Sequence, residues 1–223
     1  MKNEEIIRVL IADDHTVVRD GITALLEAES KIQVIASASD GIEAVDLAES
    51  LDPDVILLDL VMPGKDGVQA IIEIKQVNPE AKILVLTSYA ESHQVYSAIK
   101  SGAMGYLLKE SSSQDLINAI RDTYHNIPVL QPEIAHKLII DIRNSDDRVP
   151  STNELTDREI EILSQVASGK TNQEIANELF LSERTVRTHI TNILAKLQLT
   201  NRTQAAIYAL REGIAHIDYT KDK

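Results

Sequence analysis

Short apolar runs alternate with amphipathic stretches throughout the first half of the chain. The apolar runs that predict buried strands cover residues 8–12, 31–36, 55–60, 82–87 and 105–108. The amphipathic stretches that predict helices cover residues 15–29, 40–50, 68–77, 91–101 and 112–124. A strand that is buried on both faces is apolar at nearly every position, as residues 55–60 are. Five strands that alternate with five helices predict a doubly wound α/β domain around a five-stranded parallel sheet.

The pattern changes near residue 153, after which only helical periodicity remains. Two capping boxes, Thr156 with Glu159 and Thr171 with Glu174, each predict the start of a helix. Ser182 is placed to cap a longer helix over residues 183–197, with a last helix over 201–212. The apolar positions of the longer helix recur at helical spacing: Val186, Ile190, Ile193, Leu194 and Leu197. This order predicts a helix-turn-helix domain, although a plain helical bundle with a solvated face fits the same pattern.

Between these two halves lies a segment with little to bury. Pro128 and Pro132 interrupt the pattern, and residues 133–143 form an amphipathic stretch that predicts one short helix. Residues 144–152 are largely polar and predict a flexible tether. We therefore expect a first domain over residues 1–127, a linker with a short helix over 128–152 and an all-α domain over 153–223.

Polar residues that bind cations or phosphate follow four of the predicted strands. They are Asp13, Asp14, Asp59, Thr87 and Lys109. Because the carboxyl ends of parallel strands meet at one edge of an open α/β sheet, these side chains should lie together. Neighbouring carboxylates favour a hard cation such as Mg²⁺, while a hydroxyl and an ammonium suit phosphoryl oxygens. The combination predicts a carboxylate that accepts a phosphoryl group, although each residue alone could be a helix cap or a solvated strand end.

Charge is distributed unevenly along the chain. The net charge is −13, and residues 1–130 carry 10 basic against 21 acidic residues, which gives −11. Within residues 182–211, five basic residues stand against Glu183 alone, which gives a local charge of +4. This asymmetry indicates a surface for nucleic acid near the end of an otherwise acidic protein.

Three absences narrow the class of protein further. The chain has no cysteine, which excludes disulfides, thiolate metal sites and a cysteine nucleophile. It has no apolar run of about 18 residues, the length of a membrane-spanning helix. Its first residues are charged and lack the apolar centre of a signal peptide. We therefore expect a cytoplasmic protein with no membrane partner.

The front half resembles the receiver domain of two-component response regulators over about residues 6–127, with every signature position filled. The resemblance implies a flavodoxin-like fold in which Asp59 is the phosphoacceptor, modified by a sensor histidine kinase. It also implies that Asp14, Asp59 and the backbone carbonyl of Val61 ligate Mg²⁺ (or Mn²⁺), with Asp13 acting mainly through water.

The same resemblance assigns roles to three residues on neighbouring strands. Thr87 and Lys109 would hold the phosphoryl oxygens once Asp59 is modified. Tyr106 would be the ring whose orientation follows the switch, although an aromatic side chain there also packs well without switching.

Glu110 departs from the family, where a proline in a cis peptide commonly follows the lysine. A cis bond before a non-proline residue costs about 2.5–4 kcal/mol, so the geometry of this loop is not predicted.

The back half resembles the LuxR/FixJ-type DNA-binding domain over residues 154–214. The resemblance lies in the runs ELTDREIEIL, NQEIA and SERTVRTHI. It places the helix over residues 183–197 in the major groove. The polar face of this helix holds Arg184, Arg187, Thr188 and Thr191, of which Arg187, Thr188 and Thr191 would lie nearest the bases. Candidates for phosphate contacts are Thr171, Asn172, Thr185, Lys196 and Arg202. The helix over 201–212 is the usual dimer surface of this domain, but Ala205, Tyr208 and Ala209 fit a core equally well.

Together the two resemblances imply a transcriptional response regulator of the NarL/FixJ type rather than an enzyme. Phosphorylation of Asp59 would control homodimerisation and binding to promoter double-stranded DNA, with RNA polymerase as a further partner. The chemistry on the protein itself would be acceptance of the phosphoryl group by Asp59, followed by slow autodephosphorylation. Residues 86–89 and 124–133 also resemble the VraR/LiaR group of cell-envelope stress regulators.

Two other classes of protein fit part of the sequence. A phosphorylation-independent DNA-binding regulator would use the receiver as a dimerisation module, and its expected mark is the loss of Asp59, Thr87 or Lys109. None of the three is lost. A doubly wound phosphatase with an aspartyl-phosphate intermediate usually has an acid two residues after the nucleophile, where this chain has Val61.

Overall fold

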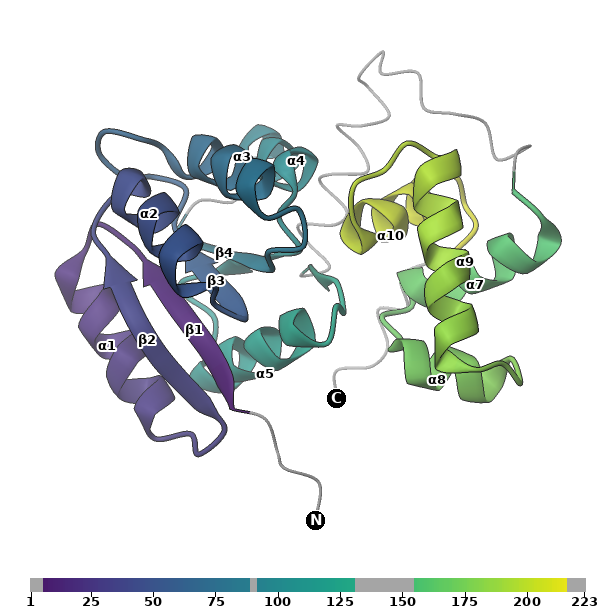
Figure 1. The fold of residues 1–223 in the computed structure, drawn as a ribbon, viewed down its shortest axis with the longest axis horizontal. Helices are drawn as coiled ribbons and strands as arrows, with labels where there is room; N and C mark the ends of the chain where they lie inside the picture. Colours follow the sequence, from purple (N-terminus) through teal and green to yellow (C-terminus); the bar gives the residue numbers. More distant parts are fainter. Residues whose placement is uncertain (1–5, 89–91, 131–154, 216–223) are drawn as a thin grey trace. The chain divides into compact units, whose positions relative to one another are not determined.

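The computed structural model describes residues 6–88, 92–130 and 155–215. The chain divides into two compact units, Met1–His125 and Asn126–Lys223 (Figure 1). The helix predicted over residues 133–143 and the tether predicted over 144–152 lie outside the described residues. None of the helices in the described ranges combines the length and the apolar character needed to cross a bilayer.

The first unit is built around a sheet whose strands run in the order β2-β1-β3-β4-β5-β6. The strands are β1 Ile7–Ala12, β2 Ile32–Ala38, β3 Val55–Leu58, β4 Ile83–Thr87, β5 Gly105–Leu108 and β6 Val129–Leu130. Strands β1 to β5 pair in parallel, and every residue of β3 and β4 is buried. The predicted doubly wound parallel sheet is therefore confirmed.

The predicted number of strands is too low by one. Val129 and Leu130 form β6 at the edge of the sheet beside β5, just beyond the division between the two units. We count β6 with the sheet because its backbone bonds to β5. Val129 and Leu130 are too few to show an alternating pattern, so the sequence did not predict this strand. So short a strand forms where the edge of a sheet offers unpaired backbone groups.

Helices cover both faces of this sheet. They are α1 Thr16–Glu27, α2 Gly41–Leu51, α3 Gly67–Val77, α4 Ser92–Ser101 and α5 Ser113–Tyr124. Helices α2, α3 and α4 lie along one face, and α1 and α5 lie on the other (Figure 1). The fully buried side chains between these layers include Leu10, Ile56, Leu57, Ile71, Leu84 and Ile120. The strand ends are thus held by a packed core on both sides.

The second unit consists of helices in the described residues. They are α7 Asp157–Ala167, α8 Asn172–Glu178, α9 Glu183–Lys196 and α10 Arg202–Arg211. Both predicted capping boxes are present, at Thr156 with Glu159 and at Thr171 with Glu174, and Ser182 caps α9. The short α8, the turn and the longer α9 confirm the predicted helix-turn-helix. Their shared core includes Ile162, Leu163, Ile175, Val186, Ile193 and Leu197.

Helix α10 contributes small and flat side chains to that core. Ala205, Tyr208 and Ala209 are all buried within the cluster of the second unit. Of the two readings left open by the sequence for these residues, the structure thus favours the core.

Candidate functional site

Charged side chains from three strand ends meet at the carboxyl edge of the parallel sheet. Ala12 and Leu58 are paired across β1 and β3, so Asp13 and Asp59 leave the sheet side by side. The Asp59 N–H donates to the Ala12 carbonyl at 2.8 Å. Both carboxylates are almost fully buried, with exposed fractions of 2% for Asp13 and 4% for Asp59.

Lys109 bridges these two carboxylates. Its Nζ lies 2.5 Å from Oδ2 of Asp59 and 2.7 Å from Oδ2 of Asp13. Burial, the largest single influence, lowers the pKa of Lys109, but hydrogen bonds and attraction to Asp13 and Asp59 outweigh it and raise the pKa overall. The Lys109 N–H also donates to the Thr87 carbonyl at 2.9 Å, which aligns the ends of β4 and β5. The buried Thr87 therefore lies at the same edge, as predicted.

The acidic groups at this edge fit a cation. Asp13, Asp14, His15 and Asp59 each offer a ligand atom, and these atoms all lie within 4.8 Å of one another. Oδ1 of Asp14 is buried without a hydrogen bond. Although Nδ1 of His15 lies 2.7 Å from that oxygen, the geometry is not that of a hydrogen bond. A buried carboxylate oxygen that lacks a donor is suited to a hard divalent ion.

His15 is a potential ligand that the sequence reasoning missed. Its only signal is its position directly after Asp13 and Asp14. Arg19 was also missed, and its Nη1 donates to the backbone carbonyl of Asp13 at 2.6 Å. The backbone N–H of His15 donates to Oδ1 of Asp13 at 2.9 Å. These contacts fix the loop that carries the two acidic residues.

The loop after β3 is shaped by close backbone contacts. A Cβ added to Gly67 would lie 2.2 Å from the carbonyl oxygen of Asp59 and 2.6 Å from Cα of Leu60, so no larger residue fits. Asp66 caps α3 by accepting from the Gln69 N–H at 2.8 Å. The Val61 N–H donates to Oδ1 of Asp59 at 3.3 Å. The carboxylate of Asp66 is thus occupied as the N-cap of α3.

Tyr106 and Glu110 flank Lys109 on β5 and in the following loop. Tyr106 is completely buried, and this burial, with the negative charge of Asp59, raises the pKa of its hydroxyl. All peptide bonds among the described residues are trans, including the bond before Glu110. The turn after Lys109 is closed instead by the Ser111 N–H, which donates to the Leu108 carbonyl at 3.0 Å.

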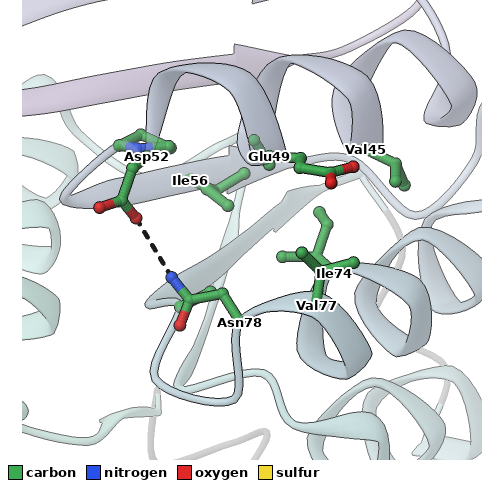
Figure 2. A pocket seen from close by; sticks show the side chains of 10 residues that line it. Val45, Glu49, Asp52, Ile56, Ile74, Val77 and Asn78 are labelled. Carbon is green, nitrogen blue, oxygen red and sulfur yellow. Dashed lines mark hydrogen bonds between the residues drawn. The ribbon is translucent and has the colours of Figure 1, made fainter.

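A hollow between α2 and α3 lies away from this edge (Figure 2). The amide nitrogen of Asn78 donates to Oδ1 of Asp52 at 3.2 Å, and this hydrogen bond connects the two sides of the hollow. Asp52 and Pro53 precede β3, so the hollow lies at the amino ends of the strands, opposite Asp59. Its lining of aliphatic and acidic side chains provides no cation for a phosphoryl group, and we do not place the functional site there.

In the second unit, one face of α9 is exposed and polar. Arg184, Arg187, Thr188 and Thr191 all lie on the surface, as predicted. Arg187 is 71% exposed, and its Nη2 lies 3.1 Å from Oε1 of Glu183. The hydroxyls of Thr188 and Thr191 donate to carbonyls one turn earlier, at 3.0 and 3.1 Å. This face presents guanidinium groups, methyl groups and hydroxyl acceptors to solvent.

The residues predicted to contact phosphates occupy different environments. Thr171, Asn172 and Thr185 lie at helix starts and are partly exposed. Lys196 instead pairs with the buried Glu159, at 2.7 Å from Nζ to Oε2. Arg202 is only 6% exposed, and its guanidinium donates to Asn172 and to the Lys170 carbonyl. The structure therefore does not present Arg202 as an exposed cation free to contact a phosphate, because its side chain is buried and donates to acceptors within the second unit.

Comparison with protein families divides the chain in the same way. Residues 9–121 match the response regulator receiver domain, and residues 153–209 match the bacterial regulatory proteins of the luxR family. The chain belongs to the LuxR-type response regulators. As a member of this family, it is a transcriptional response regulator that is controlled by phosphorylation, with a histidine kinase and DNA as its partners.

Relatives of this response regulator match over nearly the whole chain. The transcriptional regulatory protein LiaR of Bacillus subtilis is 48% identical over 94% of this chain and all of LiaR. The response regulator VraR of Staphylococcus saprophyticus is 42% identical over 93% of this chain and 98% of VraR. The predicted resemblance to the VraR/LiaR group is thus confirmed.

Solved structures give the same family. The response regulator ChrA of a heme-sensing two-component system is 35% identical, with a TM-score of 0.53, over 94% of this chain and 98% of ChrA. RcsB of Salmonella typhimurium is 27% identical, with a TM-score of 0.57, over 92% of this chain and 98% of RcsB. Both are response regulators, as this chain is.

Proposed function

We propose that Asp59 accepts the phosphoryl group and that its modification controls homodimerisation and promoter binding through α9. The observation that carries this proposal is the contact of Lys109 with both Asp59 and Asp13 at the end of three strands. A buried carboxylate held beside an ammonium is placed for nucleophilic attack on phosphorus and for later stabilisation of the added charge. We assign phosphorylation to a receiver domain over residues 1–127 and DNA binding to a domain over residues 153–223. Residues 128–152 would be the linker between them.

Mg²⁺ (or Mn²⁺) is the cofactor that we propose for the acidic edge. Asp14, Asp59 and the carbonyl of Val61 would hold it, and Asp13 would act mainly through water. The buried, unbonded Oδ1 of Asp14 supports this assignment. When bound, such an ion offsets the charge of the carboxylates and of the phosphoryl oxygens.

The phosphotransfer step forms one bond and breaks one. A carboxylate oxygen of Asp59 attacks the phosphorus of a phosphohistidine, the new O–P bond forms, and the N–P bond breaks with its electron pair left on the imidazole nitrogen. Lys109 and the hydroxyl of Thr87 then hold the phosphoryl oxygens. Once modified, the Asp59 side chain carries about −1.5 to −2 charges in place of its single carboxylate charge, beside the buried ring of Tyr106, whose position we propose follows the switch. Slow hydrolysis of the acyl phosphate resets the protein.

For DNA we propose that α9 enters the major groove. Arg187, whose side chain is 71% exposed, is the candidate for bidentate contact with a guanine, and the methyl groups of Thr188 and Thr191 suit thymine. Arg184 and Thr185 lie beside them, and Thr171 and Asn172 lie near the path of the backbone. Lys196 reaches a phosphate only if it leaves Glu159. Two copies of the protein would meet two half-sites of a promoter in the cytoplasm, where RNA polymerase is a further partner.

The phosphoacceptor is tested by incubating the wild-type protein and Asp59→Ala with acetyl phosphate and Mg²⁺. We expect phosphate to be incorporated into the wild type alone, measured by intact mass spectrometry. Equal incorporation into both proteins would contradict the proposal. Promoter binding that is unchanged by phosphorylation of the wild type would instead favour the phosphorylation-independent regulator.

A further inference from the structure

Arg202 is buried in the second unit although it carries a permanent charge. Its exposed fraction is 6%, and burial lowers the pKa of its guanidinium to about 10. Nη1 donates to Oδ1 of Asn172 at 2.6 Å, and Nη2 donates to the carbonyl of Lys170. Burying a cation away from a carboxylate is costly, and these two acceptors offset part of the desolvation penalty, while Nε of Arg202 is buried without a hydrogen bond.

The contact with Arg202 determines which way the amide of Asn172 faces. An arginine side chain offers only donors, so the atom of Asn172 that faces it is the oxygen. The amide nitrogen of Asn172 must then point away from Arg202, and it makes no hydrogen bond to another described residue. Asn172 is partly exposed, so this NH₂ group is a free donor at the surface.

The neighbouring Thr171 has no such free donor. Its backbone N–H and its hydroxyl both donate to Oε2 of Glu174, at 2.7 and 2.9 Å. Arg202 donates to the carbonyl of Lys170 and to the side chain of Asn172. These two residues precede and follow Thr171 in the chain. Of these adjacent candidates for a phosphate contact, Asn172 is therefore the one that is oriented and available.

We propose that Arg202 is a positioning residue for DNA binding, which turns the amide NH₂ of Asn172 outward so that it donates to a DNA phosphate. Arg202 itself does not touch the DNA. This inference rests on the proposed placement of α9 in the major groove. It differs from the expectation for an exposed arginine, which would contact the phosphate directly and release a counterion.

The test uses the full-length protein, phosphorylated, and a DNA duplex recovered from random sequence by the wild type. Asn172→Ala is expected to weaken binding roughly tenfold, the effect of one hydrogen bond to a charged group. Arg202→Lys keeps the charge but cannot make both contacts, and it should weaken binding by a similar factor. The double variant Asn172→Ala with Arg202→Lys should bind no more weakly than either single variant, because both changes remove the same contact.

Asn172→Asp separates positioning from folding. The carboxylate still accepts from Arg202, so the melting temperature should be equal to or higher than that of the wild type. Binding should nevertheless fall more than tenfold, because the donor is lost and a negative charge faces the phosphate. A matched control is Arg158→Lys, since Arg158 also donates to a backbone carbonyl, that of Leu179 at 2.7 Å, but does not contact Asn172. It should leave DNA affinity within about twofold.

Three results would overturn the inference. Independent, additive losses in the double variant would show that Asn172 and Arg202 act separately. A decrease of about 0.9 in the salt slope of binding for Arg202→Gln would show direct phosphate contact. Wild-type affinity for Asn172→Asp would show that the amide donates nothing to DNA. Arg187→Ala separates failure of the proposed function from failure of this inference. If Arg187→Ala also leaves DNA binding unchanged, the proposed placement of α9 in the major groove is wrong. If Arg187→Ala is the one variant that weakens binding, only the positioning role of Arg202 is wrong.

Discussion

The carboxyl edge of the receiver sheet, where we propose that Asp59 accepts the phosphoryl group, and the exposed face of α9 both concentrate charge, but they do so under opposite conditions. At the receiver edge, Asp13, Asp59 and Lys109 come from separate strand ends, and their side chains are 3%, 4% and 14% exposed. On α9, the polar residues follow one another along a single helix, and Arg187 is 71% exposed. The first group has its partners within the fold, whereas the second is open to an outside partner.

This difference determines what each charge contributes. Within a buried cluster, removing one partner leaves the others uncompensated, so stability and chemistry are coupled. On the exposed face, an ion pair such as Arg187 with Glu183 contributes little to stability, because water and salt screen it. We therefore expect substitutions at the receiver edge to change both stability and chemistry, and substitutions on the α9 face to leave stability nearly unchanged.

We expect the largest loss of stability from a substitution at Gly67, in the loop beside Asp59. In Gly67→Ala, the new Cβ would collide with the backbone of Asp59 and Leu60. Because backbone cannot move aside cheaply, we expect the free energy of unfolding to fall by at least about 4 kcal/mol, measured by urea denaturation. The change touches no charged group, so it tests whether backbone geometry alone maintains the site.

Gly21 provides the matched control for this substitution. It lies in α1, and an added Cβ would meet nothing within 4 Å. Gly21→Ala should raise the free energy of unfolding by about 0.5–1 kcal/mol, because alanine favours the helix. If both alanine variants behaved alike, the close contact at Gly67 would not be what constrains the loop.

Lys109→Met should have the next largest effect, through the charges rather than the backbone. It leaves the buried carboxylates of Asp13 and Asp59 without their shared cation. In EDTA we expect a loss of about 2–4 kcal/mol in the free energy of unfolding. Millimolar Mg²⁺ should restore much of this loss in the variant, and phosphorylation should proceed while the gain in DNA affinity is blunted. Full activation without Lys109 would contradict its role in the switch.

The pH dependence of Lys109→Met gives an independent check. The pKa of Lys109 is raised in the folded protein, so its contribution to stability is fully present below the unfolded pKa of about 10.4 and is lost as pH rises through the folded pKa. The difference in stability between wild type and variant should therefore be constant near neutrality and shrink at alkaline pH. A difference that grows with pH would have the wrong sign.

Arg187→Ala should have the smallest effect on stability, and it tests most directly whether the exposed face of α9 contributes to binding rather than to stability. The free energy of unfolding should change by less than about 0.5 kcal/mol, because the side chain is exposed. Binding to a specific site should nevertheless weaken by roughly 1–3 kcal/mol, with relaxed preference at one base pair, measured by titration against substituted duplexes. An equal loss on all sequences would make Arg187 a phosphate contact instead.

Local pattern was sufficient for much of the fold and for part of the site. The apolar run over residues 55–60 predicts a buried strand, found over Val55–Leu58, and Thr156 with Glu159 predicts a helix start, because both signals lie within a few residues. The rule that parallel strands end at one edge brings together Asp13, Asp59 and Lys109, which the structure places in contact. The edge strand β6 was missed, since its formation depends on a distant neighbour.

Spacing along the chain is enough to predict which residue types carry the chemistry, where the strands and helices begin, and which face of α9 is polar. Only the tertiary structure decided that Lys109 contacts both Asp13 and Asp59, and that Gly67 has no room for a Cβ. It alone turned Arg202 from an expected surface cation into a buried partner of Asn172. The physical reason is that burial and hydrogen-bond partners are properties of segments that meet in space, and a pattern along one segment does not contain them.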